Sequence, residues 1–515
     1  MTLRTIALAA ALFAALPACA ASAAASAAHA EHGIQWYKGD VDAAFAHAKK
    51  HNKPVFLYWG AVWCPPCNQV KATIFNRQGF IERSRAFVPV YLDGDSPNGQ
   101  KLGARFKVRG YPTMILFKPD GSEITRLPGE VDGERYLDVL ALAMNATRSV
   151  KDTLQAALAG GSPLKAEDWR LLADYSWDTD EQQIIDAKQL PATLDRLAKA
   201  APQGESATRL ALKAAAAAAG KKADSAVDKT AARELLLKVF ADARLARDNM
   251  DVLTNYAADL AEFASAPKSE ERAQLAAAAD AALRRLAADA TLSKADRLTA
   301  LDSRVALARL DREGPLPEAL LKEVREQVAA ADRDTTDAYE RQSVVYAASG
   351  VLTDAGLLDE SDALLKAELK RSHSPYYHML GLASNAKKRG DKAAAIDWYA
   401  QAYKAAKGPA TRLQWGVSYL NGLLELAPHD EARIEQTAKS VFNELASIQN
   451  AFYERNRAVL ERLSRKLAQW NAMGDHDAAL KRMSEQLSGV CAKLPANDPQ
   501  RATCKQVVDT ARAKA

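Results

Sequence analysis

Two cysteines stand close together near the start of the chain, in the run Trp63-Cys64-Pro65-Pro66-Cys67. Thiols at this spacing can form and break an internal disulfide, because a thiolate attacks a disulfide sulfur through a mixed-disulfide intermediate. Pro65 and Pro66 fix the backbone φ angle across the turn and remove two N–H donors. The pair could instead supply half of a zinc site. However, the sequence has no second such pair and its eight histidines are scattered, so we expect redox chemistry and no metal.

The elements around this pair favour a reactive thiolate. An apolar run at residues 54–59 predicts a buried strand, and a helix is predicted to begin directly after Cys64. Unpaired N–H groups at a helix N-terminus stabilise an anion. Cys64 is therefore the expected nucleophile, and Cys67 is the expected resolving thiol. No acidic residue lies between His51 and Glu82, which also favours the thiolate.

Helix and strand signals alternate from about residue 36 to residue 144. The helices are expected at 40–50, after the cysteines, and at 134–144. The strands are expected at 54–59, 87–92, 113–117 and 122–127. Strands interleaved with helices predict an α/β layer fold.

A second motif, Arg109-Gly110-Tyr111-Pro112-Thr113, follows the cysteine pair by about 45 residues. Together the two motifs resemble those of the thioredoxin family, over residues 33 to 145. The most similar members are exported domains whose first helix ends in Lys-Pro, here Lys53-Pro54. The resemblance implies a central mixed sheet flanked by helices.

The resemblance also implies which residues act. Cys64 and Cys67 would be catalytic, and Pro112 would be cis and lie against them. Trp63, Tyr111 and Pro112 would contact substrate. One position departs from the family, which often has a buried aspartate six residues before the first cysteine. Tyr58 stands there and is a poor base at neutral pH, so the proton of the resolving thiol is expected to leave through water or another group.

The first thirty residues have the pattern of a signal peptide. Arg4 precedes an apolar run from Ile6 to Leu16, and a stretch rich in Ala and Ser follows. Removing this leader lowers the net charge from +5 to +4. We expect a periplasmic protein without a membrane span in the mature chain. Cys19 lies in a weak lipoprotein-like context, and lipid attachment there is not expected.

Four cysteines remain in the mature chain, and an even number in an exported protein suggests pairing. Cys491 and Cys504 lie near the C-terminus with twelve residues between them, including two prolines. We interpret them as a structural disulfide that joins two helices.

From residue 151 to the end the apolar residues follow helical spacing, and a 34-residue period is visible. Gly356 and Gly390 are separated by this period, as are Pro375 and Pro409. The period resembles that of tetratricopeptide repeats, which stack into a solenoid; a plain helical bundle is the alternative. The predicted organisation is a leader at 1–30, a thioredoxin-like domain at 31–148, a linker at 149–165, helices at 166–335, repeats at 336–445, and C-terminal helices at 446–515.

Several aromatic residues of this helical region could line a peptide groove or fill its core. Tyr376 and Tyr377 are two of these aromatic residues. Tyr399 and Tyr403 occupy repeat-core positions, which favours packing, whereas the neighbouring Trp398 is the better candidate for a groove.

Two functions remain compatible with the sequence. The first is a periplasmic thiol–disulfide oxidoreductase that exchanges disulfides with protein clients, in the reducing direction. The second is an interaction platform that binds proteins without turnover. The intact cysteine pair favours the first. No nucleotide-cofactor motif is present, so no cofactor is expected and a reductase would need a membrane-bound redox partner. A charge of +5 over 515 residues indicates no nucleic-acid binding.

Overall fold

The computed structural model describes residues 33–108, 110–129, 132–160, 164–177, 184–220 and 227–513. The expected leader, Cys19 and Arg109 lie outside these residues. So do residues 161–163 of the expected linker.

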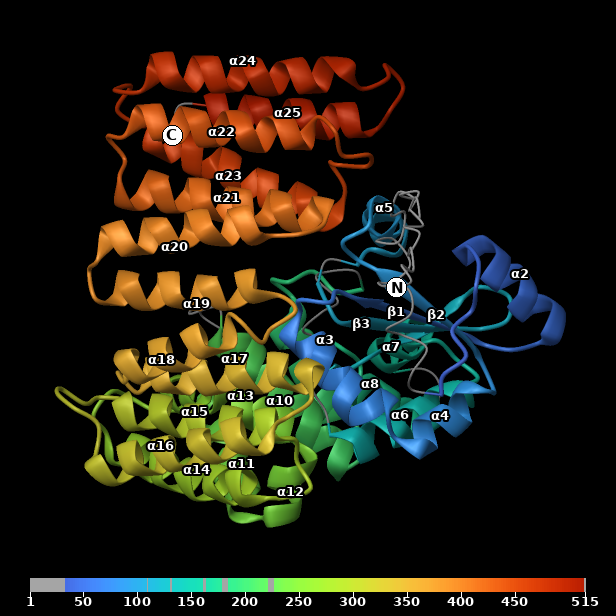
Figure 1. The fold of residues 1–515 in the computed structure, drawn as a ribbon. Coiled ribbons are helices and arrows are strands. Elements are labelled where there is room, and N and C mark those ends of the chain that lie inside the picture. Colours follow the sequence, from blue (N-terminus) through green and yellow to red (C-terminus); the bar gives the residue numbers. More distant parts are fainter. Residues whose placement is uncertain are drawn as a thin grey trace, which may run out of the picture.

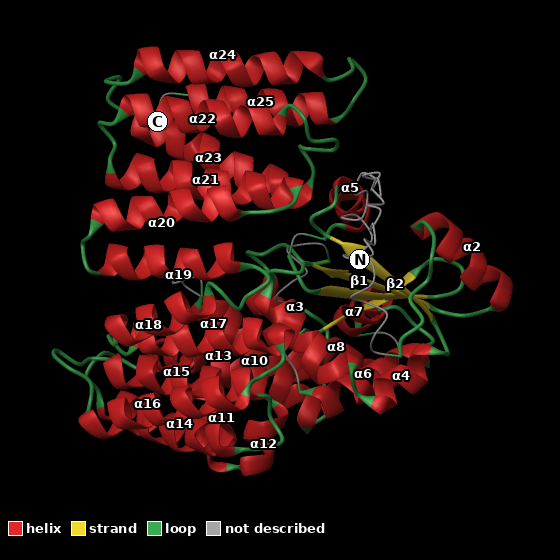
Figure 2. Ribbon diagram, viewed as in Figure 1, coloured by secondary structure: helices red, strands yellow, loops and turns green. Residues whose placement is uncertain are grey.

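A four-stranded mixed sheet forms the centre of the N-terminal domain (Figure 2). β1 runs parallel to β2 and antiparallel to β3, and β3 runs antiparallel to β4. The strand order is β2-β1-β3-β4. This arrangement confirms the predicted α/β fold. The strand bounds are β1 (Val55–Gly60), β2 (Val88–Asp93), β3 (Thr113–Phe117) and β4 (Glu123–Leu127).

Helices cover both faces of the sheet, and β1 is buried along its whole length. Phe56 and Tyr58 point into one core, with side chains of α4 and α6. Leu57 and Trp59 point into the other, with side chains of α2. Because both faces are covered, the strand is continuously apolar instead of alternating. The helices of this domain are α2 (Val41–His51), α3 (Pro65–Val70), the π-helical turn η2 (Lys71–Phe75), α4 (Gln78–Ser84), α5 (Pro97–Phe106) and α6 (Gly133–Met144).

Apolar periodicity alone did not predict α5. Its first turn is stabilised by Ser96, whose hydroxyl accepts a hydrogen bond from the N–H of Gly99 at 2.9 Å, and Pro97 occupies the first helical position. A serine followed by proline is a helix-start signal that could have revealed it.

The described residues after β4 form helices without strands. The expected linker contains α7, because Ser149 caps that helix through the N–H of Asp152 at 3.0 Å, and Val150 and Leu154 join the core beneath the sheet. The helices are α7 (Val150–Ala159), α8 (Ala166–Ala173), α9 (Leu190–Ala200), α10 (Glu205–Ala219), α11 (Lys229–Ala241), α12 (Ala243–Asp248), α13 (Met250–Ala264), α14 (Glu270–Ala288), α15 (Lys294–Arg309), α16 (Glu318–Asp334), α17 (Ala338–Asp354), α18 (Leu358–Glu368), α19 (Pro375–Lys388), α20 (Lys392–Ala405), α21 (Pro409–Leu426), α22 (Glu431–Leu445), α23 (Glu454–Trp470), α24 (Asp477–Lys493) and α25 (Gln500–Arg512).

The 34-residue period corresponds to a repeated helix ending. Gly356 follows α17 and Gly390 follows α19, and both have positive φ angles, of 83° and 78°. The next residue donates its N–H to equivalent carbonyls, Leu357 to Leu352 at 2.8 Å and Asp391 to Ala386 at 2.9 Å. Glycine favours this conformation because it has no Cβ. Assignment of these helix pairs to the tetratricopeptide family stays a prediction.

The helical region surrounds the N-terminal domain from two sides (Figure 1). Helices α8 to α18 form the first side of this contact, and α19 to α25, which stack above α18 in the view, form the second, while α3 points into the junction where α17 meets α19. On the second side, α23 contacts α5. None of the described helices is both long and apolar enough to cross a membrane.

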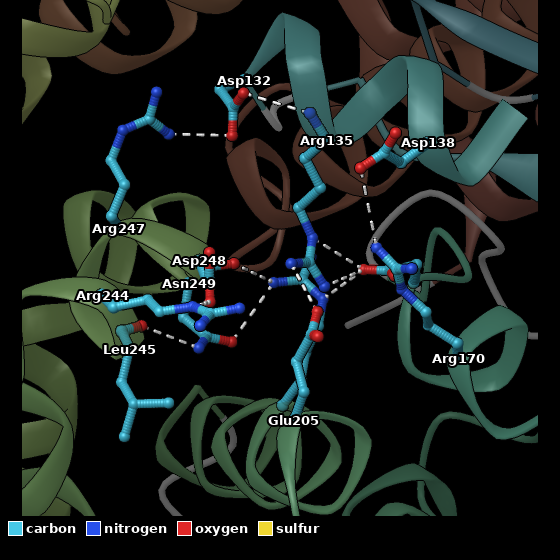
Figure 3. A network of polar contacts seen from close by, with 12 residues as sticks. Asp132, Arg135, Asp138, Arg170, Glu205, Arg244, Leu245, Arg247, Asp248 and Asn249 are labelled. Carbon is cyan, nitrogen blue, oxygen red and sulfur yellow. Dashed lines mark hydrogen bonds and ion pairs between the residues drawn. The ribbon is translucent and has the colours of Figure 1, made fainter. Parts of the chain in front are cut away.

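Buried and partly buried ion pairs connect α6 and its N-cap to the first of these two sides (Figure 3). Arg135 of α6 contacts Asp174 and Glu205, each at 2.8 Å, and Arg247 contacts Asp132 at 2.8 Å. Burial penalises each charge, so such pairs fix orientation more than they add stability. They therefore hold the N-terminal domain in a defined position on the helices.

Candidate active site

The cysteine pair lies at the start of α3. Cys64 is the N-cap residue and Pro65 takes the first helical position, where its missing N–H removes no hydrogen bond. Cys64 and Cys67 are joined by a disulfide, with 5.2 Å between their Cα atoms. The N–H of Cys67 lies 3.2 Å from Cys64 Sγ and donates to it. In the reduced state the same N–H would stabilise a thiolate on Cys64.

The loop before β3 lies against this pair. The Tyr111–Pro112 peptide bond is cis, and the carbonyl oxygen of Tyr111 is 3.7 Å from Cys64 Sγ. The Tyr111 side chain points elsewhere, since its hydroxyl donates to the Gly94 carbonyl at 2.8 Å and accepts from Gln100 at 2.9 Å. It is therefore the backbone of Tyr111 that faces the reactive sulfur.

Tyr58, on the strand that leads to the cysteine pair, lies inside the core on one face of the sheet. Its side chain is 1% exposed, and its hydroxyl has no hydrogen-bond partner among the described residues. Burial raises its pKa well above the ordinary value. Tyr58 cannot serve as the base that the family aspartate is thought to provide.

A buried lysine lies one helical turn beyond Cys67. Lys71 is 6% exposed, and its Nζ lies 5.8 Å from the centre of the Tyr91 ring and 5.7 Å from that of Tyr339. Burial lowers the pKa of Lys71 to about 8, although nearby Asp93 opposes the shift. An amine that titrates so near neutrality can exchange protons with its surroundings. The signal in the sequence was a lysine four residues after the resolving cysteine, between apolar positions.

The helical region covers the cysteine pair. Cys64 is only 2% exposed and Trp63 only 3% exposed. The Trp63 ring stacks on Tyr377 of α19, with 5.7 Å between centres, and meets Trp415 of α21 at 5.1 Å. The guanidinium of Arg455 lies 4.8 Å from the Trp63 ring. The structure thus places Trp63, predicted to contact substrate, in an apolar core between the two parts of the chain.

Polar contacts also hold the helical region over the cysteine pair. Gln342 donates from Nε2 to the Trp63 carbonyl at 3.1 Å, and His373 lies 2.9 Å from the Val62 carbonyl. Thr411 of α21 donates its hydroxyl hydrogen to Asp95. Asp95 is 7% exposed, and burial raises its pKa to about 7 against the opposing effect of the Thr411 hydrogen bond. These contacts join positions 279 to 316 residues apart in sequence.

Known proteins resemble the N-terminal part of the chain. The profile of a thioredoxin-like domain matches residues 41–143. A thioredoxin from Mycobacterium tuberculosis is 35% identical over 90 residues, which cover 17% of this chain and 73% of that protein. The chain belongs to the thioredoxin-like family. The family resemblance drawn from the sequence is thereby confirmed.

Two other relatives of this thioredoxin-like protein have names that describe disulfide chemistry. The thiol:disulfide interchange protein DsbD of Pseudomonas fluorescens is 32% identical over 102 residues, or 19% of this chain and 18% of the relative. The disulfide bond reductase DsbH of Chlamydia pneumoniae is 26% identical over 115 residues, or 19% of this chain and 66% of the relative. The chain spans about a fifth of the length of the DsbD relatives that it matches.

The remaining predicted site residues lie away from the redox pair. Cys491 of α24 and Cys504 of α25 form a disulfide, with 5.5 Å between their Cα atoms. Trp398, the predicted groove candidate, packs beside Val345, Leu365 and Leu382. Of the aromatic residues considered for a groove, Tyr376 and Tyr377 at the start of α19 are those that join the cluster around Trp63.

Proposed function

We propose that the protein is an exported thiol–disulfide oxidoreductase that reduces disulfides in protein clients. The observation that carries this proposal is the Cys64–Cys67 disulfide at the N-terminus of α3, with the Tyr111 carbonyl 3.7 Å from Cys64 Sγ. A platform that only binds proteins would need neither cysteine.

The reaction moves two electrons from the dithiol to the client. The Cys64 thiolate attacks one sulfur of the client disulfide, which breaks that bond and releases a client thiolate. Cys67 loses its proton and attacks Cys64 Sγ, which breaks the mixed disulfide and frees the second client thiolate. The client gains two electrons and two protons, and the protein is left with the Cys64–Cys67 disulfide. The Tyr111 backbone is placed to pair with an extended client segment.

The reducing direction rests on the relative that is named a disulfide bond reductase. Export rests on the leader pattern of residues 1–30. Restoring the dithiol outside the cytoplasm then needs a membrane-bound electron donor. Because Cys64 is 2% exposed, a protein client reaches it only after covering side chains of α19 and α21, such as Tyr377 and Trp415, move aside.

The test is the reduction potential of the pair, measured on the mature protein equilibrated against a dithiothreitol series. Tryptophan fluorescence reports the state, since Trp63 adjoins the disulfide. A Cys491→Ser/Cys504→Ser variant isolates the transition. A potential near ~−270 mV supports a reductase, and one near ~−120 mV would identify an oxidant instead. The absence of a reversible two-electron transition would leave only the binding platform.

A further inference from the structure

A groove runs away from the cysteine turn across the helical region. Its volume is about 640 Å³, and Pro65 and Pro66 form one end of it. The walls come mainly from α17 and α19, and residues of α13 and α15, together with Gln69, Gly129 and Leu365, complete the lining. The groove therefore begins at the redox turn, and α19, one of the helices that line the groove, also covers the cysteine pair.

The length of the groove suits an extended peptide. Along α19 it runs from Tyr377, which stacks on Trp63, to Lys388 at the other end of the helix. Eleven residues of α-helix rise about 16 Å. An extended chain advances about 3.3 Å per residue, so the groove accommodates about five residues. Free cystine, the disulfide of two single cysteines, would leave much of this length empty.

Glycine keeps one wall open. Gly350 of α17 lines the groove, and a Cβ built there would have no neighbouring heavy atom within 4 Å. Glycine inside a helix lowers the stability of that helix by about 0.5–1 kcal/mol relative to alanine. Its presence at this position is therefore better explained by the open space that it leaves in the groove. A larger side chain at residue 350 would enter the groove without displacing the protein.

Two polar groups in the groove lack partners within the part of the chain that the structure describes. They are His378 Nε2, on a side chain that is 2% exposed, and Asp302 Oδ1. The nearby Asp354 is paired with Lys388 at 2.7 Å, and the Lys388 charge only partly opposes the upward shift of the Asp302 pKa. Burial raises the pKa of Asp302 to about 7, and Asp354 adds to the shift. An incoming cation would restore the charged form of Asp302 and satisfy it.

Apolar side chains lie at the redox end. Val62 is 41% exposed and Tyr346 is 50% exposed, and they are two of the three large hydrophobic residues exposed in the described ranges. Val62 directly precedes Trp63, and the Tyr346 ring lies 5.7 Å from that of Tyr377. An exposed apolar pair beside a reactive turn suits a hydrophobic residue next to the client cysteine.

We propose that this groove binds an extended segment of about five residues from a polypeptide client, with a lysine or arginine against Asp302. His378 Nε2 pairs with the segment's backbone, and the client cysteine lies toward Pro65 and Pro66. This inference rests on the proposed function, because it names the substrate of the same cysteine pair. It also assigns the helical region a direct part in choosing the client.

Binding can be measured without any redox step. Fluorescence anisotropy of labelled hexapeptides, with serine in place of cysteine, is followed on the oxidised full chain. One peptide carries arginine four residues from the serine, and its partner carries glutamate there. We expect the arginine peptide to bind about tenfold more tightly, and Asp302→Asn to remove most of that preference. The exposed Asp475, between α23 and α24, supplies the matched control Asp475→Asn.

A second variant tests the groove independently of charge. Gly350→Leu should weaken binding of the arginine peptide about tenfold or more by filling the wall. Gly489→Leu is the matched control, because Gly489 is also a helical glycine with no atom within 4 Å of a built Cβ and lies outside the groove. Both changes remove a glycine from a helix, so neither should unfold the protein.

The outcomes separate the hypotheses. Equal binding of both peptides, or unchanged binding in Asp302→Asn and Gly350→Leu, would overturn the groove assignment. Effective competition by free cystine at the same concentration would also overturn it, because the groove would then take a small disulfide. None of these results would alter the reduction potential of the cysteine pair, so failure of the groove is distinguishable from failure of the proposed oxidoreductase.

Discussion

Replacing Asp95 with asparagine should stabilise the protein at alkaline pH and leave its stability at acidic pH unchanged. Asp95 belongs to the thioredoxin-like domain, lies at its interface with α21 and is 7% exposed. Burial raises its pKa from 3.8 to about 7. The folded state therefore binds more protons than the unfolded state between these two values, and stability falls as the pH rises through this window.

The magnitude follows from the shift. One pKa unit corresponds to about 1.4 kcal/mol, so ionising Asp95 in the folded protein costs about 4 kcal/mol above pH 7. Asparagine has no charge but can still accept the Thr411 hydrogen bond. Asp95→Asn should thus be up to about 4 kcal/mol more stable than the wild type at pH 8. The two proteins should converge near pH 4.

Urea titrations at pH 4.5, 6 and 8, followed by tryptophan fluorescence, measure this difference. Trp63 and Trp415 report directly on the interface that contains Asp95. Asp475→Asn serves as the control for losing one exposed carboxylate. A difference between Asp95→Asn and wild type that is the same at every pH would refute the reasoning, and so would a less stable variant at pH 8.

Other variants probe the remaining buried charges and the second disulfide. Lys71→Met should raise stability at pH 7 by about 3 kcal/mol, because burial lowers the pKa of Lys71 to about 8; melting curves should show this gain vanishing as the pH approaches 10.5. Arg209→Met should cost about 3–5 kcal/mol in calorimetry, since it leaves buried Asp251 without its 2.7 Å partner; an unchanged melting temperature would contradict this. Cys491→Ser/Cys504→Ser should lower stability by about 3 kcal/mol without moving the reduction potential of the other pair.

Local sequence signals predicted the chemistry and the fold around it. The strand, turn and helix that position Cys64 lie within one short stretch, and their patterns do not depend on distant residues. The repeat was also visible, because Gly356 and Gly390 satisfy a local backbone requirement at the ends of α17 and α19. The α/β fold and the family were therefore predicted correctly.

The cover over the cysteines could not be predicted in the same way. It depends on Trp63 meeting Tyr377 and Trp415, which are far away in sequence and belong to helices with their own internal periodicity. An aromatic residue beside a redox turn fits both a substrate contact and an interface core. The sequence also did not show that Trp398, next to a repeat-core position, packs partly beside Val345, Leu365 and Leu382, and its role in a groove stays a prediction.

The sequence separation of the cover contacts has a consequence for folding. The bond between Thr411 and Asp95 closes a loop of 316 residues, whereas the sheet beneath it joins segments of one short domain. Contacts of such high contact order form late, because the chain between them must be ordered first. We therefore expect the thioredoxin-like domain to form before the helices cover it, with the cysteine pair accessible at that stage. Its first redox partner can act then, before the helices assemble over it.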